Sequence, residues 1–335
     1  MTEVLNTIVD QLITTFSLEA LIALVTTGDY EALSTWEGFK AVLLPIVPVS
    51  VLFELLVLLW RRDATLSAYK VNLIIYVVNR VLGRFVMFGV MLYTIKVLGP
   101  LQPFKVPMTW YGFIYGYIVF EFSQVLSHYL AHKVRLFWCL HSTHHAPRHM
   151  NLSVSYSHFI LEYPYAEFIK VGVCLMAGVP LPMLLAAMAI DGVWGHLIHV
   201  GEGVMKNGRL GFLEKLVLTP SHHRAHHAKN PLYMDTNFGN LLPIWDRLFG
   251  TYQPQDESIE FEYGITRDVD SNSFWDVYVG EILHLYRDVV AAPGLANKLR
   301  YLYKPPGWHH DGEDKTASTI RREFLRTYRG PAVTG

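Results

Sequence analysis

The sequence predicts an all-α integral membrane protein: a helical bundle of about four spanning or hairpin helices with a cytosolic, histidine-rich helical cap. Hydrophobic residues make up 51% of the 335 positions and charged residues only 17%, whereas soluble domains usually carry about 25% charged residues. Several apolar stretches reach the roughly 20 residues that a helix needs to cross a bilayer. Most of the 16 histidines lie between His128 and His227, which points to a metal site in the cap.

The composition also excludes some classes of function. The formal net charge of −1 gives no basis for binding a polyanion such as nucleic acid. Cys139 and Cys174 have neither disulfide-rich nor zinc-finger spacing, which fits reduced thiols in a cytosol-facing protein. The first 25 residues lack the basic region of a signal peptide, and we expect Ile8–Val25 to form an amphipathic helix on the membrane surface.

Four apolar segments are expected to cross or enter the bilayer: 40–60, 69–99, 108–126 and 163–199. Arg61 and Arg62 follow the first segment, so by the positive-inside rule that end faces the cytoplasm. The first half of the second segment carries polar residues and is expected to lie in the interface or line the protein interior. The third should continue as a helix and carry its histidines out on the cytoplasmic side. The fourth has a turn at 178–182, which predicts a helical hairpin with both ends on one side.

We therefore divide the chain into three parts. Residues 1–107 are expected to form interfacial and transmembrane helices, and residues 108–255 the histidine-bearing domain. Residues 256–335 should form a cytosolic C-terminal cap with a loose tail after Pro331.

Three histidine clusters repeat helical spacing. His128 and His132 stand at positions i and i+4. Two longer clusters have histidines at i, i+3 and i+4: one is His141, His144 and His145, and the other is His223, His226 and His227. On a helix this spacing brings imidazoles onto one face, and neutral imidazole is the commonest metal ligand in proteins. The eight clustered histidines are His128, His132, His141, His144, His145, His223, His226 and His227.

Eight histidines exceed what one tetrahedral metal needs, so the count predicts a binuclear site. Imidazole suits zinc, copper, iron and nickel alike; the chemistry expected of a membrane enzyme with such a site favours iron, which activates dioxygen. His199 is a ninth candidate ligand, because it ends the returning helix on the same side. His196 is a weaker candidate, while His158 and His222 are expected beside the metals and not on them.

Ligating histidines usually donate their second ring N–H to a carboxylate or a carbonyl. Five carboxylates are placed in the sequence to accept such bonds: Glu121, Glu162, Glu202, Asp235 and Asp246. Arg224, inside the third cluster, is expected to face a lipid phosphate or to pair with a carboxylate.

These motifs resemble the fatty acid hydroxylase/sterol desaturase superfamily of membrane di-iron enzymes. The resemblance rests on HYLAH (128–132), HSTHH (141–145), HHRAHH (222–227) and NFGNLLPIWDRLFGTY (237–252). Further segments are similar to the alkylglycerol monooxygenase branch, among them NLSVS (151–155), YGIT (263–266) and PPGW (305–308). Where that branch has a glutamate after the first motif, this chain has Lys133.

The resemblance implies a multi-pass membrane enzyme with two iron ions (Fe2+/Fe3+) and a cytoplasmic active site. Its implied partners are a membrane lipid, dioxygen and an electron donor, either tetrahydrobiopterin or an electron-transfer protein. The implied reaction is hydroxylation of a lipid alkyl chain, at the carbon next to the ether oxygen if the substrate is an alkylglycerol. A hydroxylase or desaturase of sterols, ornithine lipids or fatty acyl chains is the alternative enzyme. A non-catalytic metal-binding membrane protein, such as a transporter, is the alternative of another class.

Overall fold

The computed structural model describes residues 2–15, 18–28, 35–62 and 68–330, and within these ranges the fold is helical, with no β-strand. The α-helices are α1 (Thr2–Thr15), α2 (Glu19–Thr27), α3 (Trp36–Arg61), α4 (Tyr69–Leu98), α5 (Trp110–Lys133), α6 (Arg135–His145), α7 (Glu162–Met176), α8 (Leu181–Leu197), α9 (Pro220–His227), α10 (Ile244–Phe249), α11 (Phe274–Ala291), α12 (Gly294–Tyr303) and α13 (Ala317–Thr327). Three 3₁₀ turns join them: η3 (Gly99–Leu101), η4 (Leu152–Tyr156) and η5 (Gly211–Lys215). The prediction of an all-α fold is therefore confirmed for the described residues.

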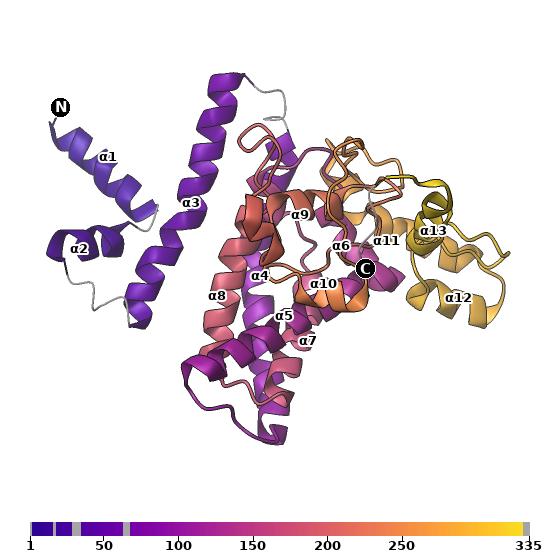
Figure 1. Cartoon of the computed structure of the whole chain (residues 1–335), viewed down its shortest axis with the longest axis horizontal. Coiled ribbons are helices and arrows are strands. Elements are labelled where there is room, and N and C mark those ends of the chain that lie inside the picture. The colour runs from indigo at the N-terminus through magenta and orange to yellow at the C-terminus, as the bar shows by residue number, and fades with distance from the viewer. Residues whose placement is uncertain (1, 16–17, 29–34, 63–67, 331–335) are drawn as a thin grey trace.

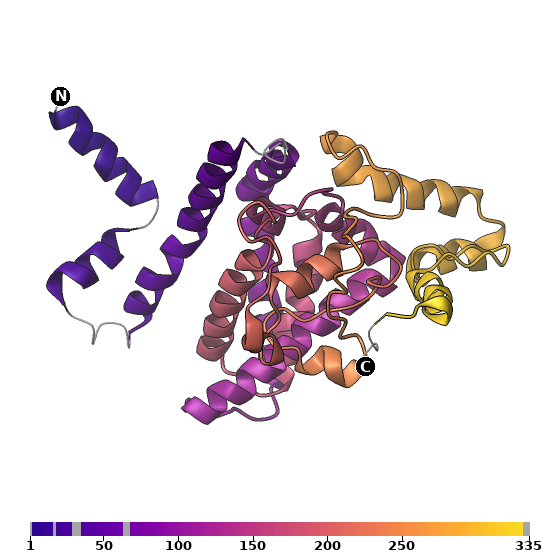
Figure 2. The same ribbon diagram turned by 45° about the horizontal axis from the view of Figure 1, so that its top comes forward.

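Four helices, α4, α5, α7 and α8, form the body of the molecule. Helix α7 packs against both α4 and α5, and α8 packs against α5 and α3. Figure 1 shows α6 and α9 at one end of this bundle, with α1–α3 on one side of the molecule and α11–α13 on the other. The turned view in Figure 2 keeps this order. The body thus offers one end at which α5, α6, α8 and α9 meet.

The predicted hairpin over 163–199 is present as α7 and α8. Gly178 lies in the turn with φ +78°, a left-handed conformation that glycine adopts at little cost. A Cβ there would lie 2.4 Å from the ring of Phe104, so the position also requires the absence of a side chain. Buried apolar residues of the two helices, Val171 and Leu184, pack with Tyr117 and Phe120 of α5. This core fixes α5 relative to the hairpin.

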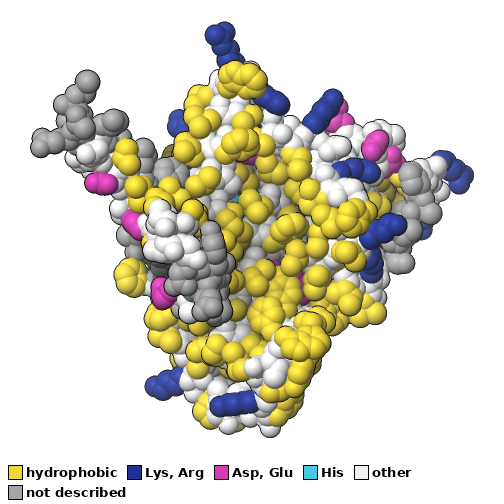
Figure 3. All heavy atoms as spheres, turned by 60° about the vertical axis from the view of Figure 1, so that its left-hand side comes forward, with side chains coloured by type: hydrophobic (Ala, Val, Ile, Leu, Met, Phe, Trp, Pro, Cys, Tyr) yellow, Lys and Arg dark blue, Asp and Glu magenta, His cyan; other side chains and the backbone are white. Residues whose placement is uncertain are grey.

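One helix of the described residues is long and apolar enough to cross a bilayer, over Glu37–Arg61. Shorter apolar helical stretches cover Phe85–Leu101 and Leu181–Leu197. Glu54, an acid inside the long helix, is buried and accepts hydrogen bonds from the backbone N–H groups of Leu152 (2.7 Å) and Gly201 (2.8 Å). The other side of α3 is apolar and exposed, and Figure 3 shows a face largely covered by hydrophobic side chains with basic residues at its edges.

The first half of α4 lines the protein interior, one of the two positions expected for it. Asn72 donates to the Ser153 hydroxyl (2.9 Å), and the Asn79 amide donates to the His158 carbonyl (2.6 Å). The N-terminal segment forms two helices, α1 and α2, in place of one helix over Ile8–Val25. The predicted loose tail after Pro331 lies outside the described residues.

Candidate metal centre

Four structural elements bring all nine predicted histidines together. The last turns of α5 carry His128 and His132, and the last turns of α6 and α9 carry the two longer clusters. His199 follows the end of α8. Eight of the nine histidines are buried, and His128 is half-buried. Whether they bind metal stays a prediction, but their convergence is a property of the fold.

The nine rings form two adjacent groups in which the candidate ligand nitrogens lie within 4.8 Å of one another. Group one consists of His128, His132, His141, His145 and His226. Group two consists of His144, His199, His223 and His227. His145 and His227 stack with ring centroids 4.4 Å apart, so the groups share a wall.

The middle histidine of each longer cluster belongs to the opposite group from its two neighbours. His141 and His145 lie in group one, whereas His144 lies in group two. A helix turns about 100° per residue, so positions i and i+4 nearly coincide and position i+3 points about 60° away from the first. Because of the same offset on α9, His226 lies in group one, whereas His223 and His227 lie in group two. Each longer cluster therefore contributes to both groups.

Hydrogen bonds at Nδ1 fix the tautomer of five rings. A carbonyl oxygen only accepts, so a ring Nδ1 bonded to it must carry the proton. The acceptors are the carbonyls of Phe238 for His128 (2.9 Å), Val154 for His144 (3.2 Å), Gly195 for His199 (2.5 Å) and Thr236 for His226 (2.7 Å), and the carboxylate of Glu162 for His141 (2.7 Å). In each neutral ring the lone pair is therefore on Nε2, which points into a group.

These lone pairs face one another at short range. The Nε2 atoms of His128 and His141 lie 3.1 Å apart, and those of His144 and His199 lie 3.3 Å apart. With both protons held at Nδ1, no N–H stands between the facing nitrogens, and the contact is repulsive without a cation. Metal–imidazole bonds of about 2.0–2.1 Å place ligands at right angles about 3.0 Å apart. The arrangement therefore fits a metal ion in each group.

Burial favours the neutral form of three of the rings, His145, His199 and His226. It lowers the pKa of His226 to about 3 and that of His199 to about 3. The pKa of His145 lies well below its ordinary value because of burial and the neighbouring His227. Metal ligation requires deprotonated imidazole, so the centre is suited to binding a cation at neutral pH. The buried Nε2 atom of His226 has no hydrogen-bond partner among the described residues.

Two of the five candidate carboxylates reach the histidines. Glu162 accepts from His141 and, at 2.9 Å, from Nδ1 of His158, whose ring stacks on His144. Asp235 binds Lys133 and lies 3.4 Å from Nδ1 of His132. His158 thus lies beside the groups, as expected.

The other three carboxylates contact backbone N–H groups or hydroxyl groups instead of histidines. Glu121 accepts from the Leu241 N–H (3.0 Å), and Glu202 accepts from the Tyr263 hydroxyl. Asp246 accepts from the N–H groups of Phe238 and Gly239, both at 2.8 Å. It therefore holds the segment whose carbonyl binds His128.

Three further side chains lie outside both groups. His196 contacts the hydroxyls of Ser50 and Ser155, both at 2.9 Å, so it is not a tenth member. His222 contacts the Tyr252 hydroxyl at 2.8 Å. The expectation for Arg224 was wrong: it is buried and donates to the carbonyls of Val200, Met205 and Lys206, where it joins loops instead of meeting phosphate or carboxylate.

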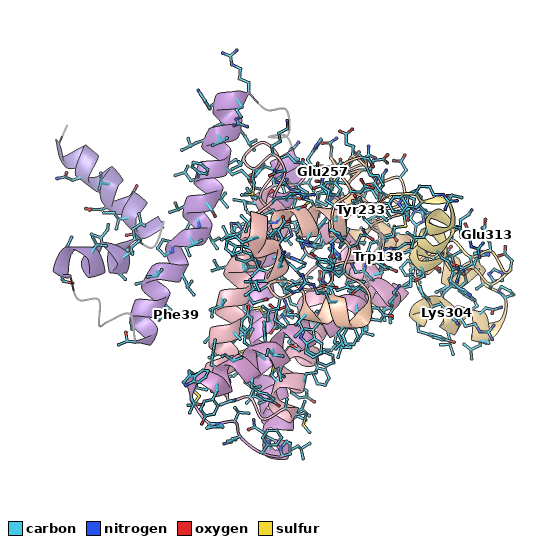
Figure 4. The ribbon with its side chains drawn as sticks, viewed as in Figure 1. Phe39, Trp138, Tyr233, Glu257, Lys304 and Glu313 are labelled. Carbon is cyan, nitrogen blue, oxygen red and sulfur yellow. The ribbon has the colours of Figure 1, made fainter. Side chains whose placement is uncertain are left out.

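A cavity of about 100 Å³ borders the histidines on the side of the C-terminal cap. Its wall includes four of the rings, His132, His145, His226 and His227. Trp138, labelled in Figure 4, lines it together with residues 305–307 from the cap. No pattern in the sequence indicates that Trp138 or the C-terminal cap reaches the centre, because only tertiary packing brings them there.

Comparison with known proteins adds a family relationship. Residues 113–251 match the fatty acid hydroxylase family model. Human alkylglycerol monooxygenase is 31% identical over 233 residues, which cover 70% of this chain and 48% of that protein. The Xenopus tropicalis alkylglycerol monooxygenase is 32% identical over 208 residues, 62% of this chain and 44% of that protein.

A bacterial relative is the ornithine lipid hydroxylase OlsE of Rhizobium tropici, 31% identical over 157 residues, 47% of this chain and 46% of that protein. The chain spans about half the length of the curated relatives it matches. No solved structure gives a significant match. The matched segment 113–251 contains all nine clustered histidines.

Proposed function

We propose that this chain is a di-iron monooxygenase that hydroxylates the alkyl chain of a membrane lipid. The match of residues 113–251 to the fatty acid hydroxylase family model supports this proposal. The observation that carries the proposal is the pair of histidine groups with facing Nε2 lone pairs. The nine ligands would be His128, His132, His141, His145 and His226 for one ion, and His144, His199, His223 and His227 for the other.

Two iron ions bound there would supply the activation of dioxygen. The chain's own part is to hold the ligands, keep them neutral and exclude water. Backbone carbonyls orient four of the rings through Nδ1, and burial favours the neutral form of His199 and His226. The cavity beside His132 and His226 offers a place for the reacting carbon.

The membrane arrangement is part of the proposal. Helix α3 would span the bilayer, and α4, α5 and the α7–α8 hairpin would complete a multi-pass bundle. The histidines would then lie on the cytoplasmic side, with Arg61 and Arg62. Residues 108–255 would be the catalytic unit, residues 1–107 its membrane anchor and residues 256–335 its cap.

For the substrate we propose an ether-linked alkylglycerol, oxidised at the carbon next to the ether oxygen, because two relatives, 32% and 31% identical over 62% and 70% of this chain, are named alkylglycerol monooxygenases. One oxygen atom would enter the lipid and the other would leave as water. The two electrons this requires would come from tetrahydrobiopterin or an electron-transfer protein. The match to an ornithine lipid hydroxylase favours a hydroxylated amino lipid as the second candidate.

The test compares total lipids from cells that make the full chain with those from cells that make His226→Ala. His149→Ala is the matched control, because His149 is exposed and belongs to neither group. We expect loss of alkylglycerol ethers and appearance of fatty aldehyde with the wild type and the control only. A lipid gaining one oxygen without ether loss would support the second candidate. Identical lipids in all strains, with iron bound to the wild type, would contradict the proposal.

A further inference from the structure

The C-terminal helices α11 and α12 each expose apolar side chains along one face, and these two faces together are called the stripe here. On α11 it consists of Trp275, Leu283, Tyr286 and Val290, and on α12 of Leu295, Leu299 and Tyr303. At 3.6 residues per turn, the α11 members fall within about 80° of one another, and so do those of α12. Trp275 is 70% exposed and Leu295 71%, so the stripe has no covering partner among the residues that the structure describes.

The opposite side of the two helices is anchored to the body. Leu285, Ala292 and Tyr301 form a buried cluster with Cys139 of α6. Figures 1 and 2 place α11 and α12 at the edge of the molecule away from α3. The stripe therefore faces outward from a fixed platform and has no part in the histidine centre.

Charge is distributed unevenly between the two sides. All three acids of α11 are paired with arginines of the body: Asp276 and Glu281 with Arg267, and Asp288 with Arg135. Helix α12 contains no acid. Three bases flank the stripe, Arg287, Lys298 and Arg300, and none of them forms an ion pair among the described residues. The outward side thus combines aromatic and aliphatic residues with unpaired positive charge.

We propose that α11 and α12 lie on the bilayer surface, with this stripe in the headgroup region and its bases against anionic lipid. An apolar face flanked by lysine and arginine is the pattern of interfacial helices, and tryptophan and tyrosine are enriched at that depth. Long basic side chains can keep their charges at the phosphates while their stems cover apolar surface. The inference rests on the membrane attachment proposed above, but not on the oxidation.

Binding of α11 and α12 to the bilayer surface would also determine how the cavity beside the histidines is oriented relative to the membrane. Helix α12 ends at Tyr303, and residues 305–307 directly after it line the cavity beside the histidines. Figure 4 places Lys304, between the two, within the cap. A cap resting on the bilayer would bring this wall of the cavity to the level at which lipid headgroups lie.

Site-directed spin labelling of the full chain in nanodiscs tests the proposal. Cys139 and Cys174 are buried, so a cysteine introduced on the surface is labelled selectively. Leu299→Cys and Tyr286→Cys place one label on each helix, and Glu323→Cys on exposed α13 is the control. Collision rates are compared for oxygen, which concentrates in the bilayer, and for a water-soluble nickel chelate.

We expect both stripe labels to collide several-fold more with oxygen than with nickel relative to the control. The difference should be larger in discs of phosphatidylcholine with phosphatidylserine than in phosphatidylcholine alone. Adding Lys298→Glu with Arg300→Glu should remove that gain. Stripe labels that behave like the control would overturn the proposal. So would protection from both reagents that depends on the number of chains per disc, since it would indicate a second copy on the stripe. Neither readout requires iron or turnover, so failure here is distinct from failure of the proposed oxidation.

Discussion

Glu162→Gln is the sharpest perturbation of the centre that leaves every proposed ligand in place. The carboxylate of Glu162 accepts two N–H bonds, from His141 at 2.7 Å and from His158 at 2.9 Å. Glutamine offers one oxygen and one NH₂ group, so one of the two donors would face another donor. His141 would then lose the bond that holds its proton at Nδ1, or His158 would leave its stack on His144.

Loss of such an outer partner typically lowers metal affinity 10- to 100-fold, which is about 1.4 to 2.7 kcal/mol. We expect that weakening for iron in group one, measured by competition with a chelator on the full chain in nanodiscs. Glu202→Gln is the matched control, because the Glu202 carboxylate accepts from Tyr263 and belongs to neither histidine group. An unchanged affinity in Glu162→Gln would refute the account of how the ring is oriented.

Three further changes probe the support, the cavity and the protonation of the centre. Gly239→Ala places a Cβ 2.8 Å from the Asp246 carboxylate and should lower the free energy of unfolding by about 1–3 kcal/mol. Gly192→Ala is the control, because its Cβ would have no atom within 4 Å and should not lower the free energy of unfolding. Equal denaturation midpoints for the two variants would contradict the prediction. Ala317→Phe narrows the cavity of about 100 Å³ and should lower lipid turnover by up to about 100-fold at unchanged iron content; full turnover would place the substrate elsewhere. Burial lowers the pKa of His226 to about 3, so between pH ~6.5 and that pKa only the unfolded chain takes up this proton, and this ring alone should cost the iron-free protein about 1.4 kcal/mol per pH unit. A denaturant series at falling pH measures that loss, and a flat profile would contradict it.

Histidine spacing predicted that eight of the nine rings lie close together, because i, i+3 and i+4 positions point in related directions on any helix; His199 was predicted from its place at the end of the returning helix. It did not predict that His144 and His226 cross to the opposite group. That exchange depends on how α6 and α9 are placed relative to each other, which spacing within one helix does not contain. The hairpin over 163–199 was predictable because glycine and proline mark its turn.

The partners of the rings were harder to predict. Every residue has a carbonyl, so nothing in the sequence distinguishes Phe238 or Thr236 as an acceptor. Glu162 was one of five candidate carboxylates, and only the packing of α6 near α7 selects it. The backbone donors that Glu54 of α3 binds, at Leu152 and Gly201, were likewise beyond prediction, because they lie 98 and 147 residues further along the chain.

Metal stoichiometry of the full chain tests the central claim most directly. Iron is titrated anaerobically into metal-free protein in nanodiscs, and bound iron is counted per chain by elemental analysis. The account predicts about two iron ions per wild-type chain, with weaker binding at one site in His226→Ala and at the other in His223→Ala. A chain that binds no iron, or that binds it equally well in both variants, would contradict a centre built from two histidine groups.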